Sequence, residues 1–116
     1  MPAHPLPPAR RLRRRGEFQR VFDARRRAHG RYLTIVFSPC EGGESRLGIV
    51  ASRKLGGAVV RNRAKRLIRE AFRTCSNPVT PGDLVIIPKA AATKVKAADL
   101  AGDYLATLRR MGLSKQ

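Results

Sequence analysis

The sequence predicts an α+β fold, a two-layer α/β sandwich in which helices pack on a small mixed sheet. The 116 residues suit a single domain. Segments with helical and with strand character follow one another in the order helix, strand, strand, helix, strand, helix. An apolar share of 42% allows a modest core, and this core must be mostly aliphatic because aromatic residues make up only 5% of the chain.

Residues 1–14 are predicted to form a flexible, basic, proline-rich arm, because four prolines and a block of arginines bury too little apolar surface to fold. We expect the domain to span residues 15–112 and to leave a short tail at 113–116. Its first helix is predicted near residues 16–27. The apolar stripe that predicts this helix consists of Phe18, Val21 and Phe22.

Three segments have the composition of β-strands. Residues 31–39 and 46–54 contain β-branched and apolar side chains bounded by turn residues, and we expect them to pair as a hairpin. Residues 83–90 include four consecutive apolar residues, as is typical of a buried interior strand. A last helix is predicted at 96–110, and its inner face comprises Leu100, Tyr104, Leu105 and Leu108.

The longest predicted helix covers residues 58–75 and has two chemically opposite sides. At 100° per residue, one apolar arc contains Val60, Ala64, Leu67, Ile68, Ala71, Phe72 and Cys75. The other side carries a basic ridge of Arg61, Lys65, Arg69 and Arg73, with Asn62 and Arg66 beside it and Arg63 on the far flank near Glu70. Like charges four residues apart destabilise a helix, so we expect an external anion to neutralise this ridge.

The charge of the chain indicates a polyanionic partner. Lys and Arg number 25 against 8 Asp and Glu, which gives a formal net charge of +17. Such a charge destabilises the compact state by self-repulsion, and arginine binds phosphate through paired hydrogen bonds. We therefore predict a nucleic-acid partner. An acidic membrane surface is the other polyanion that fits, although no apolar run reaches the roughly 20 residues that span a bilayer.

The segment KLGGAVVRNRAKRLIRE, residues 54–70, resembles the signature of the bacterial ribonuclease P protein family. The resemblance extends over roughly residues 10–110 and includes further segments in the family's order. These segments are FQRVF at 18–22, RLGIVASRK at 46–54 and GDLVIIPKA at 82–90.

The resemblance implies a function. The family's protein is the small partner of a large catalytic RNA, and together they remove the 5′ leader from precursor tRNA. Mg²⁺ and the hydrolytic chemistry belong to the RNA, so we expect the protein to hold no cofactor, no metal, no small-molecule substrate and no catalytic residue. The general rule favours a right-handed crossover between parallel strands. The family's crossover is left-handed, and we expect the left-handed form here.

The resemblance also implies two RNA-binding surfaces. The catalytic RNA is expected to contact a basic surface made of Arg53, Lys54, Arg61, Asn62, Arg63, Lys65, Arg66, Arg69 and Arg73. The single-stranded leader is expected to lie in a groove between the first helix and the sheet. The residues expected to line this groove are Phe18, Phe22, Tyr32 and Ser52, with Tyr32, Ser52 and Lys54 on the strands of its floor. The sequence leaves open which of the two phenylalanine rings faces the groove.

Two other functions remain open from the residues alone. One is a structural protein that binds ribosomal RNA, and the other is a DNA-binding regulator that uses the long helix. The regulator is disfavoured because no short helix precedes residue 58 at helix-turn-helix spacing. Cys40 and Cys75 lack the spacing of a metal site and are expected to be free thiols. The N-terminus lacks the hydrophobic stretch of a signal peptide, so we expect a cytoplasmic protein.

Overall fold

The computed structural model describes residues 10–40, 44–74 and 81–114. The helices are α1 (Arg15–Asp23), α2 (Ala58–Thr74) and α3 (Ala97–Arg110), with two short 3-10 helices η2 (Arg53–Leu55) and η3 (Ala90–Lys94). The strands are β1 (Arg26–His29), β2 (Leu33–Pro39), β3 (Arg46–Ile49) and β4 (Gly82–Pro88). The predicted α+β class and mixed sheet are confirmed, and the predicted elements follow one another as expected, with one additional strand, β1. Among the described residues, no helix is long and apolar enough to cross a membrane.

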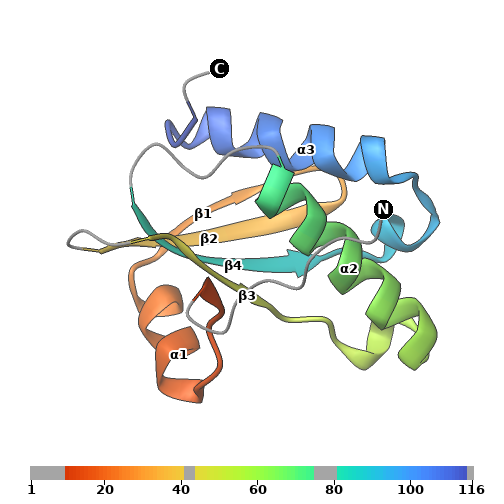
Figure 1. The fold of residues 1–116 in the computed structure, drawn as a ribbon, viewed down its shortest axis with the longest axis horizontal. Helices are drawn as coiled ribbons and strands as arrows, with labels where there is room; N and C mark the ends of the chain where they lie inside the picture. Colours follow the sequence, from red (N-terminus) through yellow and green to blue (C-terminus); the bar gives the residue numbers. More distant parts are fainter. Residues whose placement is uncertain (1–9, 41–43, 75–80, 115–116) are drawn as a thin grey trace.

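The four strands form one sheet in the order β1-β2-β4-β3 (Figure 1). β1 and β4 each pair with β2 in the antiparallel sense, and β3 pairs with β4 in the parallel sense. The predicted hairpin between the second and third strand segments is therefore wrong, because β4 lies between β2 and β3. β4 offers β2 a ladder of seven residue pairs, whereas the four residues of β3 could offer only a shorter one.

The strand at Arg26–His29 was not predicted, since the sequence pattern predicts a first helix that extends to residue 27. α1 instead ends at Asp23, and the chain turns at Arg25, which has a φ of 58°. As a strand, residues 26–29 instead add four residue pairs to the edge of the sheet. In β1 the side chain of Arg26 stacks on the Phe37 ring of β2, with 5.2 Å between its guanidinium carbon and the ring centroid.

Alternation along the strands divides the core between the two faces of the sheet. One face packs against α2 and α3, and its buried side chains include Leu33, Ile35 and Phe37 of β2. The other face packs against α1, and there Val21 of the helix contacts a cluster that contains Val36 of β2. Figure 1 shows the same arrangement, with α1 on the side of the sheet away from α3. α2 joins the parallel pair β3 and β4, and the left-handed sense of this crossover stays a prediction.

The folded domain extends beyond the predicted boundaries at both ends. Leu12 is 6% exposed, and its amide N–H donates to the carbonyl oxygen of Leu47 on β3 at 2.8 Å. Leu113, placed by the sequence in the tail, is 1% exposed and belongs to the main core. The rest of the predicted arm, residues 1–9, lies outside the described residues, as do Cys75 and the last two residues.

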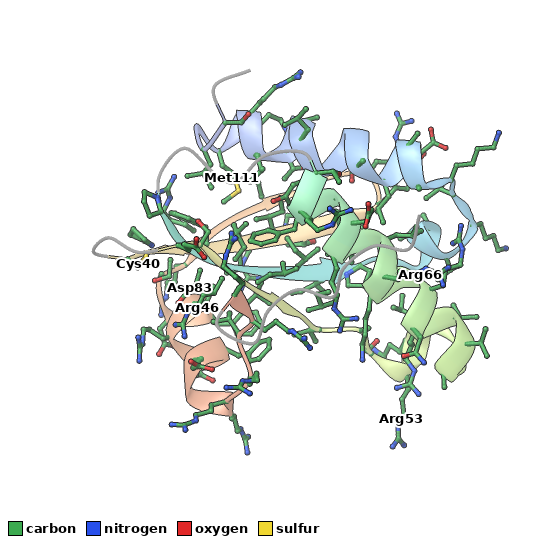
Figure 2. All side chains as sticks on the ribbon, viewed as in Figure 1. Cys40, Arg46, Arg53, Arg66, Asp83 and Met111 are labelled. Carbon is green, nitrogen blue, oxygen red and sulfur yellow. The ribbon has the colours of Figure 1, made fainter. Side chains whose placement is uncertain are left out.

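Arg46 of β3 ties α1 to the sheet through two carboxylates. Its guanidinium lies 2.7 Å from Glu17 of α1 and 2.8 Å from Asp83 of β4 (Figure 2). The Glu17 carboxylate also accepts the amide N–H groups of Arg14 and Arg13, each at 2.9 Å, at the start of α1. These two backbone hydrogen bonds, together with Arg46, lower the pKa of Glu17 from 4.5 to about 2.

The depressed pKa predicts how stability depends on acid. A carboxylate with a folded-state pKa below its unfolded value stabilises the fold above about pH 4.5, and this contribution disappears as the pH falls toward 2. Thermal melts between pH 6 and pH 2 should therefore show a loss of melting temperature across this window. The Glu17→Gln variant should lose less melting temperature over this pH range, because the contribution of the Glu17 carboxylate is absent from it. If the variant and the parent showed the same pH dependence of melting, the contribution assigned to Glu17 would be contradicted.

Candidate nucleic-acid interface

A groove runs between α1 on one side and β3 with α2 on the other. It consists of two hollows of about 110 and 490 Å³, which share Phe18, Ile49 and Lys65 in their linings. The first hollow is further lined by Arg11, Leu12, Leu47, Gly48 and Arg69. The second is further lined by Arg13, Arg15, Phe22, Val50 and Ala51. The groove thus has an apolar floor and cationic walls.

Both phenylalanines of α1 face the groove. Phe18 and Phe22 are half-buried and pack against the small core under α1, and each also lines the groove. An aromatic ring that has one side in the core and an open side is a rigid platform on which a nucleic-acid base can stack. The sequence left open which of the two rings faces the groove. In the structure both rings line the groove, and both also pack against the core under α1.

Gly48 of β3 allows the Phe18 ring to approach the sheet closely. A Cβ atom at this position would lie 2.6 Å from Cε1 and 2.8 Å from Cζ of Phe18, and 3.1 Å from Cβ of Leu12. Any side chain on β3 at this point would push the ring out into the groove. The glycine thus sets the depth of the groove beside α1.

α2 presents its basic ridge along the rim of this groove. Ala64, Ile68 and Phe72 turn inward and are buried, so the helix orientation is fixed by its apolar arc as the sequence predicts. Lys65 and Arg69 come next around the helix and line the groove. Asn62 and Arg66 lie further out and are exposed, and Figure 2 shows the position of Arg66 on this helix.

Two arginines of α2 differ from their predicted setting. Arg61 is half-buried, and its Nε is buried with no hydrogen-bond partner among the described residues. Arg63 does not approach Glu70. Its Nη2 donates to the carbonyl oxygen of Val95 at 2.9 Å and its Nη1 to that of Thr93 at 3.4 Å, so it fastens α2 to the η3 segment. Glu70 instead pairs with Arg73 at 2.6 Å.

The strand residues expected in the floor of the groove are placed differently. Tyr32 lies on the opposite face of the sheet, because it packs against the main core and its amide N–H donates to Asp103 of α3 at 2.7 Å. Ser52 and Lys54 are exposed and follow β3 rather than belonging to it. Arg53 is also exposed on η2 and is labelled in Figure 2. Tyr32 precedes β2, so the alternation of that strand does not place its side chain. Among the described residues it is not part of the groove lining, and it borders a hollow beside α3 instead.

Sequence reasoning missed the contribution of the segment before α1. Arg11 and Arg13 line the groove, yet both fall in the segment predicted to be a flexible arm. Arg15, the first residue of α1, lines it as well. Arg11 forms an isolated parallel bridge with Leu47, which places this segment along the edge of β3. The single buried Leu12 within a run of arginines was the available signal, because it is the apolar side chain that anchors them.

The family model of ribonuclease P matches residues 6–112 of the chain. The chain belongs to the ribonuclease P protein family. A ribonuclease P protein component from Desulfovibrio desulfuricans is 39% identical over 111 residues, which cover 91% of this chain and 85% of the relative. One from Coxiella burnetii is 37% identical over 91 residues, covering 78% of this chain and 75% of the relative.

Solved structures of the family share the fold. The Staphylococcus aureus ribonuclease P protein superposes with a TM-score of 0.81 at 27% identity, covering 90% of this chain and 96% of that one. The Thermotoga maritima ribonuclease P protein gives a TM-score of 0.77 at 32% identity, covering 86% and 96%. Membership of the ribonuclease P protein family supports the function of a protein component of this endoribonuclease and disfavours the alternative function, that of a ribosomal protein.

The contrast between Arg63 and Arg66 predicts that their substitution affects stability to different extents. Arg63→Ala should lower the free energy of unfolding by about 1–3 kcal/mol, because two carbonyl groups next to η3 lose their donor. Arg66→Ala should change it by less than about 0.5 kcal/mol, since the side chain is exposed. Denaturant titration of both variants measures this, and equal effects would show that the Arg63 contacts contribute nothing.

Gly48→Ala should lower the free energy of unfolding by about 1–3 kcal/mol, because the added methyl group overpacks the contact with Phe18. The matched control is Gly102→Ala on α3, where a Cβ meets nothing within 4 Å. There the substitution should stabilise the protein by about 0.4–1 kcal/mol, since alanine restricts the unfolded chain. Destabilisation at residue 102 but not at residue 48 would contradict the packing described for the groove.

Proposed function

We propose that this protein holds the single-stranded 5′ leader of precursor tRNA in the groove beside α1, while the exposed side of α2 contacts the catalytic RNA of ribonuclease P. The observation that supports the leader site is the pairing of aromatic platforms with cationic walls in one groove. Stacking contributes about 1–3 kcal/mol per base and tolerates any base. Such a groove suits an unpaired strand whose sequence varies from one substrate to the next.

The proposal assigns the chemical step to the RNA. The polar side chains that line the groove, with Asn62 and Arg66 of α2 beside it, are arginines, lysine and asparagine, which bind and orient phosphate groups. Arginine stays protonated at neutral pH and does not exchange protons in a reaction. Mg²⁺ is expected at the active site of the RNA, and the protein's part is to raise the affinity of the complex for its substrate and its metal.

Two surfaces on one side of α2 fit two RNA partners. Lys65 and Arg69 face the groove, whereas Asn62 and Arg66 point outward beyond it. A leader in the groove would therefore lie directly beside the RNA docked on α2. This adjacency is what a subunit needs when it positions a scissile bond next to a catalytic RNA.

Reconstitution at low magnesium tests this proposal. Adding the protein to ribonuclease P RNA should stimulate cleavage of a precursor tRNA with a leader and should lower the magnesium concentration needed for half-maximal rate. Absence of stimulation would overturn the proposal.

The salt dependence of affinity tests the groove itself. Five basic side chains line it, so the leader's contribution to log K should fall with log salt with a slope of about −3.5, at about −0.7 per phosphate contacted on a single strand. Lys65→Gln should reduce the magnitude of that slope by about 0.7. The control Lys96→Gln, at the exposed start of α3, should leave it unchanged, and an equal change in both variants would count against a groove-bound leader.

A further inference from the structure

The edge strand β1 carries exposed donors on the same face of the sheet as the groove. In the β1–β2 ladder Arg27 lies opposite Val36 and His29 opposite Thr34. Directly opposed residues of an antiparallel pair share a face, and Val36 is part of the core under α1. Arg27 and His29 therefore stand on the α1 side of the sheet, where both are exposed.

The preceding arginine shows the opposite, structural role. Arg26 points to the other face, where its guanidinium stacks on Phe37 and its Nη2 donates to the carbonyl oxygen of Met111 at 3.1 Å. These contacts connect β1 to the end of α3. The side chain of Arg27 forms no ion pair or hydrogen bond within the described part of the chain. No polar contact inside the protein therefore explains why its guanidinium stands at this position.

His29 is held in a fixed orientation. Its Nδ1 lies 2.9 Å from the hydroxyl oxygen of Thr34, a side chain that is only 6% exposed. When the Thr34 hydroxyl donates to Nδ1, the neutral imidazole carries its proton on Nε2. The ring then presents an N–H donor from the edge of the sheet.

One row of paired residues on this face of the sheet links the groove to these donors. Phe22 lines the groove and packs, with Ile87 of β4, against the core under α1. Ile87 lies opposite Thr34, and Thr34 lies opposite His29. The same face of the sheet thus leads from the aromatic platforms of α1 across β4 and β2 to the donors on β1.

We propose that Arg27 and His29 form a distal phosphate-binding subsite for the single-stranded leader, at the far edge of the sheet from α2. The inference rests on the proposed leader groove and extends it. β1 lies three strand spacings from β3, about 14 Å, and stacked nucleotides advance about 3.4 Å along a strand. About four more nucleotides carry the chain from the groove to β1. The subsite therefore serves long leaders and not short ones.

The test compares holoenzyme affinity for two precursor tRNAs that differ only in leader length, about 4 and about 12 nucleotides, lengths chosen from the same spacing. Arg27→Gln should weaken binding of the long-leader substrate about 3- to 10-fold and leave the short-leader substrate unchanged. The salt slope for the long leader should also fall in magnitude by about 0.7, the value for one phosphate contact.

Arg109→Gln is the matched control, because Arg109 is exposed near the end of α3 and its loss changes the net charge equally. If Arg27→Gln weakened binding equally for both leader lengths, or if the control had the same effect, the side chain would contribute only general electrostatic attraction and not a subsite. An unchanged long-leader affinity would leave Arg27 only the role of keeping an edge strand from pairing with other chains. Either result overturns the inference. A parent holoenzyme that ignores the leader altogether would instead overturn the proposed function.

Discussion

The position of α1 depends on the ion pairs of Arg46 with Glu17 and Asp83. A helix of nine residues is marginal by itself in water, so its place must come from tertiary contacts. The Asp83 side chain is 8% exposed, and without the guanidinium its charge would be buried without compensation. Because α1 forms one wall of the groove, this small network supports the surface on which the proposed function rests.

Several carboxylates stabilise the fold, whereas many of the cations lie at the surface. Glu17, Asp83 and Asp103 each accept hydrogen bonds that hold elements of the fold together. Lys65, Arg66 and Arg69 form no ion pair among the described residues, although they lie on one helix. Self-repulsion on this side of the molecule is thus uncompensated within the described fold, and an RNA phosphate backbone would relieve it.

Periodicity located α2, β4 and α3 to within a residue or two, because long segments with one consistent pattern leave few alternatives. It failed where a choice depended on partners distant in sequence. Whether β2 pairs with β4 or with β3 depends on which strand offers the longer ladder of residue pairs, and no single segment shows this. Tyr32 stands before β2, and its place beside α3 comes from a hydrogen bond of its amide N–H to Asp103, a residue distant in sequence. The run of arginines at residues 10–15 reads as disordered until Leu12 is seen to find a partner on β3. The family signature, in contrast, identified the family correctly, because it consists of consecutive residues, 54–70, and depends on no distant partner.

The central claim is that the groove beside α1 receives an unpaired RNA strand. Titration of the isotope-labelled protein with a short single-stranded RNA, followed by amide chemical shifts, tests it most directly. The account predicts the largest shifts at Phe18, Gly48 and Lys65, which line the groove, with Gly102 of α3 unaffected. Shifts concentrated on α3, with the amides of the groove unmoved at saturation, would contradict it.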